Sequence, residues 1–538
     1  MSESSAPPTA ENVEPPPSAN GGPSLPPRRY GAVAGLVAGA VAVTTGMLAA
    51  GVIDVVSPID AVGSEFIDRV PPWLKELAIR WFGTNDKLAL RVGIVVTLGI
   101  AALIVGFLAV RRLAAGVIGI GVFGFVGALA AVHRPGESGT AALPPLIGTA
   151  IGIPLLIQLA RPTIKQVRET PGPSRVPLGW DRRRFLASTG SAAAVAVVAG
   201  GVAQIIENRR VASIRKAIPD ALPTVAPPGA NVPAVANVPA DATLSPITPF
   251  ITPNKDFYRI DTALSFPRIS LSKWKVDIEG MVDNPLTFSY NDLLSRPQVE
   301  RIVTLCCVSN EVGGEYISNA TFQGIMLADL LNEAGVQNGA EQVFSTSLDG
   351  WTCGFPVAAA LDGRDAMVAV GMNGEPLPLE HGFPARLVVP GLYGYISATK
   401  WLKSIKLTTW DAAEGFWVPR GWARDAPIKT QSRIDVPRDG EDVAAGPTKI
   451  AGIAWAQHRG VARVEVRVDQ GPWQRARLGT DVTDDAWRQW VLDWDAKPGK
   501  YTIQVRATDK TGTTQTAEVT PPDPDGATGY HTRTVQVA

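Results

Sequence analysis

Five long stretches without charged side chains dominate about the first 210 residues of this 538-residue chain. They run over Gly31–Ile53, Val92–Val110, Leu113–Val132, Ala141–Ala160 and Phe185–Ile206. A helix rises about 1.5 Å per residue, so roughly 20 apolar residues cross the hydrocarbon core of a bilayer, which is about 30 Å thick. A helix in a water-soluble protein would also carry a polar face, and these stretches carry none. The sequence therefore predicts five transmembrane spans and a multi-pass location in the cell membrane.

Basic residues around these spans predict their orientation, because Lys and Arg concentrate on the cytoplasmic side of a membrane. Arg28 and Arg29 precede the first span, and Arg111 and Arg112 separate the second from the third. The link between the fourth and fifth spans is also strongly basic, with Arg161, Lys165, Arg168, Arg175, Arg182, Arg183 and Arg184. Five spans place all three segments on one side. We therefore expect a cytoplasmic amino terminus and an extracytoplasmic location for everything after the fifth span.

The start of the fifth span resembles a twin-arginine export signal. Such signals place two arginines before Phe-Leu and a hydrophobic stretch, and this chain reads Asp181-Arg182-Arg183-Arg184-Phe185-Leu186. The alternative is a plain anchor that follows the positive-inside rule. No small-x-small cleavage site is evident, so we expect the span to remain as an anchor. None of the spans has Asp, Glu or Lys in its middle, which argues against an ion path.

The overall composition excludes several classes of protein. With 50 basic and 50 acidic residues the formal net charge is zero, which argues against a nucleic-acid-binding protein. Three Cys rule out a disulfide framework and a metal site built from four thiolates. Four His are too few for a membrane protein that holds several haems between pairs of histidines.

The length of the whole chain suggests about three or four domains, and the part after the spans divides by composition. Lys273–Glu279 alternates between apolar and polar residues among helix-like pieces, which predicts an α+β domain. Ala462–Asp469 also alternates, and short strands at regular spacing there are typical of an immunoglobulin-like β-sandwich. The predicted order is a disordered tail (1–30), the transmembrane domain (31–208), a Pro-rich linker (209–251), the α+β domain (252–433) and the sandwich (434–538).

Two adjacent cysteines, Cys306 and Cys307, end an apolar strand just before a polar turn. Site residues often occupy such a position. From the residues alone a cysteine here is a nucleophile, an inert buried side chain, or one ligand of a metal that a cofactor holds. A hydrolase would need a base, for which His381 and His458 are the only plausible candidates, and no local nucleophile motif supports one.

The segment Thr304–Asn310 resembles the T-L-x-C-x-x-N signature of the sulfite oxidase superfamily of molybdopterin enzymes. The resemblance continues in Trp274–Gly280, in Thr321–Leu331 and, most specifically, in Met372–Gly391. Residues after Gly452 are similar to the family's carboxy-terminal dimerisation domain. The resemblance therefore covers about residues 252–538 and implies a molybdenum–molybdopterin cofactor (Mo-MPT).

Carried over residue by residue, the resemblance makes Cys307 the catalytic thiolate ligand of molybdenum and Cys306 a structural neighbour. A soft thiolate suits a metal that the dithiolene sulfurs of the pterin also bind. The terminal phosphate of molybdopterin needs cationic and hydrogen-bonding groups. The matching positions are His381, Arg386, Ser397 and Lys400, and those that match less closely are Asn254, Tyr258, Arg259 and Thr346.

Departures from the family pattern bear on the substrate. Sulfite-oxidising members have F-x-R-N-H where this chain has Phe257–Thr262, and an active-site tyrosine where the alignment places Trp422. They also have basic residues where this chain has Glu311–Gly314. Fewer cations disfavour a small dianion, so we expect reduction of a sulfoxide or similar small oxo-substrate, with electrons from a separate haem- or quinone-linked partner. Sulfite oxidation and a non-catalytic envelope binding protein are the alternatives, and a homodimer through the carboxy-terminal domain is a further expectation.

Overall fold

The computed structural model describes residues 27–71, 81, 86–134, 137–169, 182–225 and 247–538. Most of the predicted tail, residues 1–26 of 1–30, and the most proline-rich part of the predicted linker, residues 226–246, lie outside these ranges.

The chain forms two compact units that each combine several stretches of sequence. The first unit comprises Met1–Ala49, Val92–Ala128 and Leu143–Val202. The second unit comprises Ala50–Arg91, Leu129–Ala142 and Ala203–Ala538.

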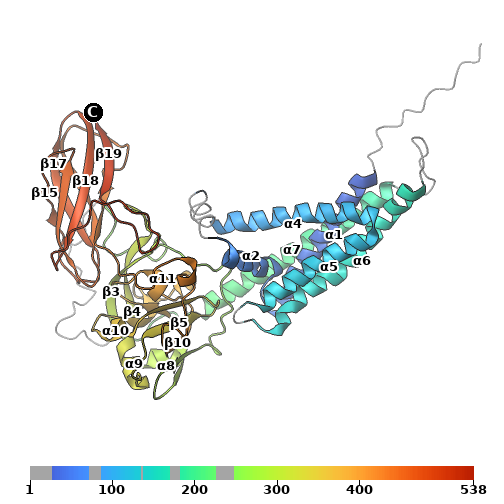
Figure 1. Ribbon diagram of the computed structural model, residues 1–538, viewed down its shortest axis with the longest axis horizontal. Helices are drawn as coiled ribbons and strands as arrows, with labels where there is room; N and C mark the ends of the chain where they lie inside the picture. The colour runs from blue at the N-terminus through green and yellow to red at the C-terminus, as the bar shows by residue number, and fades with distance from the viewer. Residues whose placement is uncertain (1–26, 72–80, 82–85, 135–136, 170–181, 226–246) are drawn as a thin grey trace, which may run out of the picture. The chain divides into compact units, whose positions relative to one another are not determined.

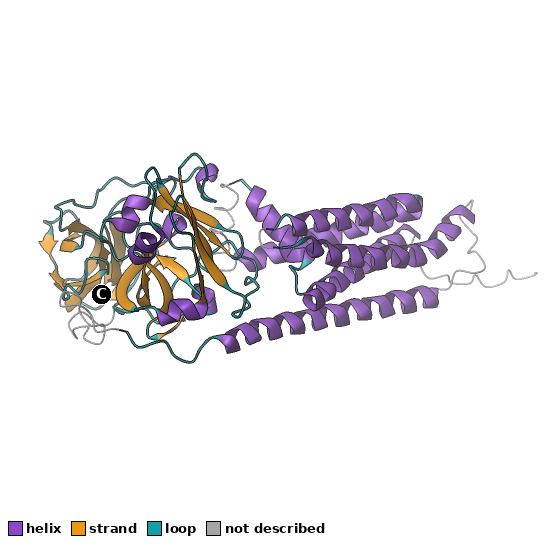
Figure 2. Cartoon of the chain, turned by 90° about the horizontal axis from the view of Figure 1, so that it is seen from below, coloured by secondary structure: helices purple, strands orange, loops and turns teal. Residues whose placement is uncertain are grey.

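Five long helices account for the apolar stretches of the sequence, and Figures 1 and 2 show them side by side in a bundle. They are α1 (Pro27–Ile53), α4 (Asp86–Arg111), α5 (Leu113–Val132), α6 (Leu143–Glu169) and α7 (Arg182–Ala217). Each is long and apolar enough to cross a membrane, so the five apolar helices that the sequence predicts are present. The last helix continues past the predicted end of its span at Ile206 and includes a charged final stretch up to Ala217.

Small residues bring the helices of the first unit together. A Cβ atom on Gly35 would lie 2.2 Å from the carbonyl oxygen of Ala102, and one on Gly106 would lie 2.2 Å from that of Gly31. Helices α1 and α4 therefore meet backbone to backbone, at a separation that no larger residue permits. This is the close packing that small residues favour in membranes, where water does not drive apolar helices together.

A short amphipathic helix and a 3₁₀ turn from the links between spans belong to the second unit. Helix α2 (Pro58–Arg69) begins at Ser57, whose hydroxyl accepts a hydrogen bond from the Asp60 amide at 3.1 Å, as an N-cap residue does. The 3₁₀ helix η2 (Gly139–Ala142) supplies Ala141, which shares a small apolar cluster with Val55 and Ala61.

The region after the helices is rich in β-strands, and Figure 2 shows that its helices are short. One sheet has the order β2-β1-β10-β5-β6, with bounds β1 (Lys275–Gly280), β2 (Leu286–Ser289), β5 (Gln342–Ser347), β6 (Thr352–Pro356) and β10 (Leu402–Thr408). A second sheet has the order β3-β4-β7-β8, and β9 also pairs with β7. Its bounds are β3 (Val299–Cys306), β4 (Ile317–Met326), β7 (Met367–Met372), β8 (Glu375–Pro376) and β9 (Arg386–Val388).

Short helices connect these strands and cover their apolar faces. They are α8 (Tyr290–Ser295), α9 (Leu327–Ala334), α10 (Val357–Leu361), η5 (Leu379–His381), α11 (Gly394–Ser397) and η6 (Val418–Arg420). Helix α9 buries Leu327, Leu330 and Leu331, whose spacing puts them on one face. Ser289 and Asp292 close a capping box at the start of α8.

Strands dominate the end of the chain and form two sheets. The first has the order β11-β13-β17-β16 and the second β12-β19-β18-β14-β15. Their bounds are β11 (Gln431–Val436), β12 (Asp442–Val443), β13 (Gly446–Trp455), β14 (Val461–Val468), β15 (Gln474–Arg475), β16 (Arg477–Leu478), β17 (Arg488–Ala496), β18 (Gly499–Asp509) and β19 (His531–Val537). Ile450 and Trp490 of the first sheet share a core cluster with Val464, Ile503 and Val535 of the second, so the sheets pack face to face.

The carboxy-terminal strands are fastened to β3, the strand that carries the cysteines. The Thr304 hydroxyl accepts a hydrogen bond from the Trp487 amide at 2.7 Å and donates one to the Asn319 side chain at 2.8 Å. The Thr304 carbonyl accepts from the Gln457 side chain at 3.0 Å, and its amide donates to the Asp485 carbonyl at 2.9 Å. Trp487 also belongs to the apolar core around β3, so this part of the chain packs as one body with the strand.

Candidate active site

The two cysteines differ in their surroundings although both are buried. Cys306 belongs to the large apolar core cluster, and Cys307, one residue past the end of β3, does not. Burial raises the pKa of both thiols, and hydrogen bonds from Ser309 partly oppose the rise at Cys307. Among the described residues, no group of three His, Cys, Asp or Glu side chains lies close enough to hold a metal ion. A metal at Cys307 would therefore take its other ligands from a cofactor.

Tyr258 and the start of α11 lie beside the cysteine pair. A Cβ atom on Gly394 would lie 3.7 Å from the Cys306 carbonyl oxygen and 3.8 Å from the Tyr258 hydroxyl. Burial raises the pKa of the Tyr258 phenol well above its usual value, and negative charge on Cys307 and Cys306 would raise it further, whereas Arg386 opposes the rise. Tyr258 is thus held as a neutral phenol beside the cysteine site.

Arg386 and Lys400 flank the turn that carries His381. A Cβ atom on Gly382 would lie 3.1 Å from the Cβ atoms of both Arg386 and Lys400, and the φ angle of Gly382 is +114°, so this position requires glycine. The Arg386 Nη1 donates to the His381 carbonyl at 3.1 Å, and the Lys400 Nζ donates to the Glu380 carbonyl at 3.2 Å. The turn therefore presents two cations side by side.

Arg386 is a buried guanidinium without a counter-ion among the residues that the structure describes. Its side chain lies over the Phe322 ring at 5.7 Å, and the residue is only 5% exposed. Burial lowers its pKa to about 10, and it still carries its charge at neutral pH. Burying an unpaired charge is costly, so the arrangement fits a site that an anion completes.

His381 stays neutral at physiological pH. Its Nε2 lies 2.8 Å from the Asn254 carbonyl, which can only accept, so Nε2 carries the proton and Nδ1 is left as an acceptor. Burial, together with the Arg386 and Lys400 charges, lowers the pKa of His381 to about 4. The histidine can therefore hydrogen-bond a cofactor but adds no positive charge to the site.

Lys400 already has an anionic partner, Asp261. Its Nζ lies 2.6 Å from the Asp261 carboxylate, which also pairs with Arg259 at 3.0 Å and with Lys87. Burial would raise the pKa of Asp261, but Lys400, Lys87 and Arg259 together hold it well below its usual range. Burial lowers the pKa of Lys400 to about 8 despite Asp261. Three cations thus share one carboxylate, which leaves positive charge beside Arg386.

The other predicted site residues differ in how closely they join this cluster. Asn254 accepts a hydrogen bond from the Asn373 side chain at 2.8 Å and is tied to His381 through its own carbonyl. The Ser397 hydroxyl is fully buried and donates to the Tyr393 carbonyl at 3.0 Å. Thr346 lies on β5 next to Ser345, whose hydroxyl lies 2.7 Å from Thr399. Because side chains alternate along a strand, Thr346 faces away from Ser345.

Sequence reasoning missed the two ends of the ion-pair cluster, Asp261 and Lys87. Asp261 stood out only as a departure from the family pattern, and nothing in the sequence predicts that it pairs with both lysines. Lys87 lies at the start of an apolar stretch and 174 residues before its partner, so no local pattern connects them.

The site as a whole suits an anionic pterin cofactor that carries a metal. A buried thiol outside the apolar core lies at one end, and an uncompensated guanidinium with Lys400 lies at the other. Tyr258 and its neighbour Phe257 connect the two ends. The Tyr258 hydroxyl lies beside Gly394 of the cysteine site, and Phe257 packs on the Phe322 ring, over which Arg386 lies. Thiolates suit soft metals, and guanidinium groups suit phosphates.

Known proteins share this part of the chain. The family model "Oxidoreductase molybdopterin binding domain" matches residues 263–417. Mitochondrial sulfite oxidase of Homo sapiens is 31% identical over 303 residues, which are 48% of this chain and 55% of that protein. Sulfite oxidase of Gallus gallus is 31% identical over 323 residues, 51% of this chain and 69% of that protein.

A bacterial relative matches over a shorter segment. The uncharacterized oxidoreductase YuiH of Bacillus subtilis (strain 168) is 36% identical over 152 residues, which are 28% of this chain and 73% of that protein. The chain spans about half the length of the mammalian sulfite oxidases that it matches.

Proposed function

We propose, from the premise that the chain belongs to the sulfite oxidase family of molybdopterin-dependent oxidoreductases, that it transfers oxygen atoms outside the cytoplasm while anchored in the membrane. The family's cofactor is molybdenum–molybdopterin. The observation that carries the proposal is a buried thiol, Cys307, linked through Tyr258 and Phe257 to a buried guanidinium without a described counter-ion, Arg386. A metal and an anionic pterin would satisfy both groups.

In the proposed site each residue has a defined task. Cys307 binds molybdenum, Arg386 and Lys400 hold the phosphate, and Ser397 supports their loop through its bond to the Tyr393 carbonyl. The polar groups assigned to the pterin are Asn254, Tyr258, Arg259, Thr346 and His381. When bound, the cofactor supplies a two-electron centre at which an oxygen atom is exchanged with the substrate.

We propose a neutral oxo-substrate, such as a sulfoxide, which takes up two electrons and two protons and releases a sulfide and water. The Tyr258 phenol keeps its proton at neutral pH and is a candidate donor at the site. Trp422 packs 5.7 Å from Tyr395, next to Gly394 of the cysteine site, so an indole lines this side. An indole offers an apolar face to an organic substrate and no cation to a small dianion.

The nearby arginines have other partners, which also supports a neutral substrate. Arg259 pairs with Asp261 at 3.0 Å, and Arg424 pairs with Glu414 at 3.3 Å. Arg420 lies over the Phe416 ring at 3.7 Å and donates to the Asp68 carbonyl at 2.9 Å. Sulfite oxidation is the second candidate, favoured by the names of the human and chicken relatives.

The division of the chain into two compact units supports an extracytoplasmic location for the candidate active site. The stretches Ala50–Arg91 and Leu129–Ala142, which the positive-inside rule assigns outside, belong to the same compact unit as the residues after Ala203. The proposal includes use of the Arg182–Arg184 signal for export, a separate haem- or quinone-linked electron carrier, and an immunoglobulin-like carboxy-terminal sandwich through which the chain forms a homodimer.

Metal analysis and turnover of the full-length protein in detergent test the proposal. We expect about one molybdenum and one pterin per chain, sulfoxide reduction with reduced viologen, and little sulfite oxidation with ferricyanide. Sulfite turnover with kcat/KM of about 10⁴–10⁸ M⁻¹s⁻¹, the range of efficient enzymes, would select the second candidate. Absence of both metal and pterin from protein made in a cofactor-producing host would select a non-catalytic binding protein instead.

A further inference from the structure

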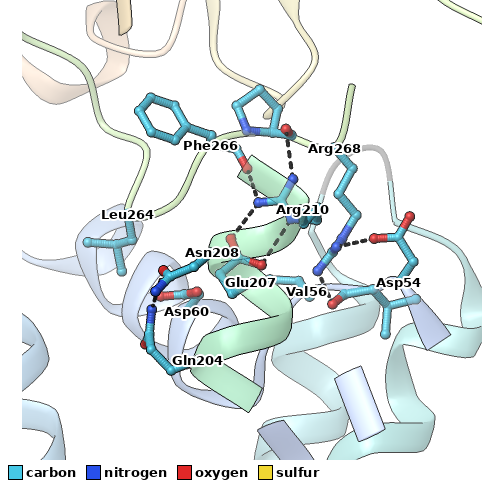
Figure 3. Close-up of polar contacts among 12 residues, drawn as sticks. Asp54, Val56, Asp60, Gln204, Glu207, Asn208, Arg210, Leu264, Phe266 and Arg268 are labelled. Carbon is cyan, nitrogen blue, oxygen red and sulfur yellow. Dashed lines mark hydrogen bonds and ion pairs between the residues drawn. The ribbon is translucent and has the colours of Figure 1, made fainter. Parts of the chain in front are cut away.

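The segment Asp261–Arg268, which begins in the candidate site, is held by arginines from two of the long helices. Arg91 of α4 donates to the Leu264 carbonyl at 2.7 Å, and Arg210 of α7 donates to the Phe266 carbonyl at 3.2 Å. Figure 3 shows Arg210 pointing at the segment from α7. These are backbone contacts, so they constrain the path of the segment and not only its side chains.

A third contact fixes the far end of the same segment. Arg268 pairs with the Asp54 side chain and donates to the Val55 carbonyl, both just after the end of α1 (Figure 3). A second carboxylate, Glu137, lies 3.8 Å from Arg268. Burial raises the pKa of Glu137, although Arg268 opposes the rise. A spacer that only lifts a catalytic domain away from the membrane does not predict these contacts.

Lys87, four residues before Arg91 on the same helix, joins this contact region to the candidate site. Its ammonium group pairs with Oδ1 of Asp261, while Lys400 takes Oδ2. The Asp261 side chain is 5% exposed and that of Lys400 is 11% exposed, so this pair is shielded from water, whereas Lys87 reaches it from a side chain that is 30% exposed. A single carboxylate therefore connects a residue of α4 to a lysine assigned to the cofactor phosphate.

The balance of charge in this cluster depends on Lys87. Three cations, Lys87, Arg259 and Lys400, pair with the single carboxylate of Asp261, and a fourth, Arg386, acts on Lys400. Without Lys87, Asp261 would be free to neutralise Lys400 more completely. With Lys87 on the other oxygen, more of the charge on Lys400 and Arg386 is available to an anion. Buried charges interact more strongly than exposed ones, so the loss of one cation is felt at the neighbouring groups.

We infer that Lys87 of α4 belongs to the site that holds the anionic end of the cofactor, so that the helix ends complete a site which the β-rich region alone leaves weaker. The inference rests on the proposed function. It makes Lys87 a positioning residue, because it acts through Asp261 and not by touching the reacting atoms. It also gives the membrane helices a task in retaining the cofactor besides attachment.

Retention of the cofactor by the full-length protein in detergent tests the inference. The readouts are molybdenum by mass spectrometry, pterin by fluorescence after oxidation, and the rate at which both are lost on incubation over a series of salt concentrations. We expect Lys87→Ala to lose cofactor about 10-fold faster than the unmodified protein, which corresponds to about 1.4 kcal/mol. Lys87→Arg, which keeps the charge, should restore retention.

Two further variants separate charge from docking and this inference from the proposed function. Arg210→Ala removes a contact to the same segment but leaves the ion pairs of Asp261 in place, so we expect it to retain cofactor. Equal loss from Arg210→Ala and Lys87→Ala, or normal retention by Lys87→Ala, overturns the inference. Arg386→Ala should lose cofactor whatever Lys87 does, and normal retention by Arg386→Ala would instead overturn the proposed phosphate site.

Discussion

The helix bundle and the β-rich region pack their side chains in different ways: small residues form the contacts in the bundle, and large aromatic residues fill the core of the β-rich region. In the bundle, α1 and α4 touch through glycines, and the only large side chain there that is fully buried among the described residues is Leu156. In the β-rich region the largest fully buried side chains are the indoles of Trp401, Trp455, Trp487 and Trp490. Water drives large apolar surfaces together, whereas lipid does not, so helices in a membrane depend on close fit.

Charged and buried polar side chains are also distributed differently between the helix bundle and the β-rich region. The spans carry no charged residue near their middles, whereas the β-rich region buries Arg386, His381 and Asp485 within its core or at its interfaces. A buried polar group needs a partner or a function. Close packing of small residues therefore distinguishes the helix bundle, and buried polar groups distinguish the β-rich region. Substitutions in each region test this difference.

The largest effect is expected at the site itself, where chemistry should depend on one thiol. Cys307→Ser should reduce turnover to background, because a hydroxyl is a poor ligand for a soft metal, while most of the pterin stays bound. Steady-state kinetics and metal content measure this. Cys306→Ser is the matched control, because Cys306 lies in the apolar core. A comparable loss of activity in Cys306→Ser would contradict the assignment of Cys307 as the metal ligand and would favour Cys306.

In the bundle, added bulk should matter more than lost polarity. Gly35→Leu places a side chain where a Cβ atom already lies 2.2 Å from the Ala102 backbone. We expect destabilisation at or above the ~1–3 kcal/mol usual for overpacking, read as a lower melting temperature in detergent. Gly121→Leu on α5 is the control, since no atom lies within 4 Å of a Cβ there. If both variants melt alike, close fit is not what holds the bundle.

A buried carboxylate should make the β-rich region sensitive to pH. Burial raises the pKa of Asp485 to about 7, above its usual value of 3.8, so the folded state binds a proton that the unfolded state releases. The contribution of Asp485 to the free energy of unfolding is fully present below about pH 4 and is lost as the pH rises through 7. It changes by ~1.4 kcal/mol per pH unit between the two pKa values.

Asp485→Asn should remove this dependence. The amide oxygen can still accept the His458 backbone hydrogen bond, which measures 2.9 Å. Unfolding monitored by fluorescence at pH 5 and pH 8 should show a smaller difference than in the unmodified protein, with the variant more stable at pH 8. An unchanged difference would place the sensitivity elsewhere.

The smallest of these effects concerns the bond between the cysteine strand and the carboxy-terminal sheets. Thr304→Val leaves the Trp487 amide and the side-chain oxygen of Asn319 without these partners, at about 1–3 kcal/mol. Thr304→Ser keeps the hydroxyl and should behave almost like the unmodified protein. Chemical denaturation compares the two. A stable Thr304→Val variant would show that apolar packing at Trp487 suffices to hold the strand.

Local patterns predicted some of these features, and contacts between distant segments account for the rest. Uninterrupted apolar stretches identify a span by themselves, and the cysteine motif identifies a strand end. The continuation of α7 to Ala217 was missed because Glu207 and Arg210, which pair at 2.5 Å, read as the end of an apolar stretch and not as a helical ion pair.

Contacts between residues far apart in the sequence also determine the electrostatics of the candidate site. The sequence motif placed Arg386 and Lys400 in one role, but only the structure distinguishes the guanidinium without a counter-ion from the lysine that pairs with Asp261. Trp422 was predicted from alignment alone, and its packing against Tyr395 depends on a turn that no periodicity reveals.

Thr304 has a consequence for the order in which the protein is made. Its partner Trp487 lies 183 residues later, so the strand that carries Cys307 cannot reach its final position until the ribosome has produced nearly the whole chain. We therefore expect insertion of the cofactor to follow synthesis of the chain. A message cut short before the last sheets is expected to yield protein without cofactor, because the strand before the proposed metal ligand was never fastened.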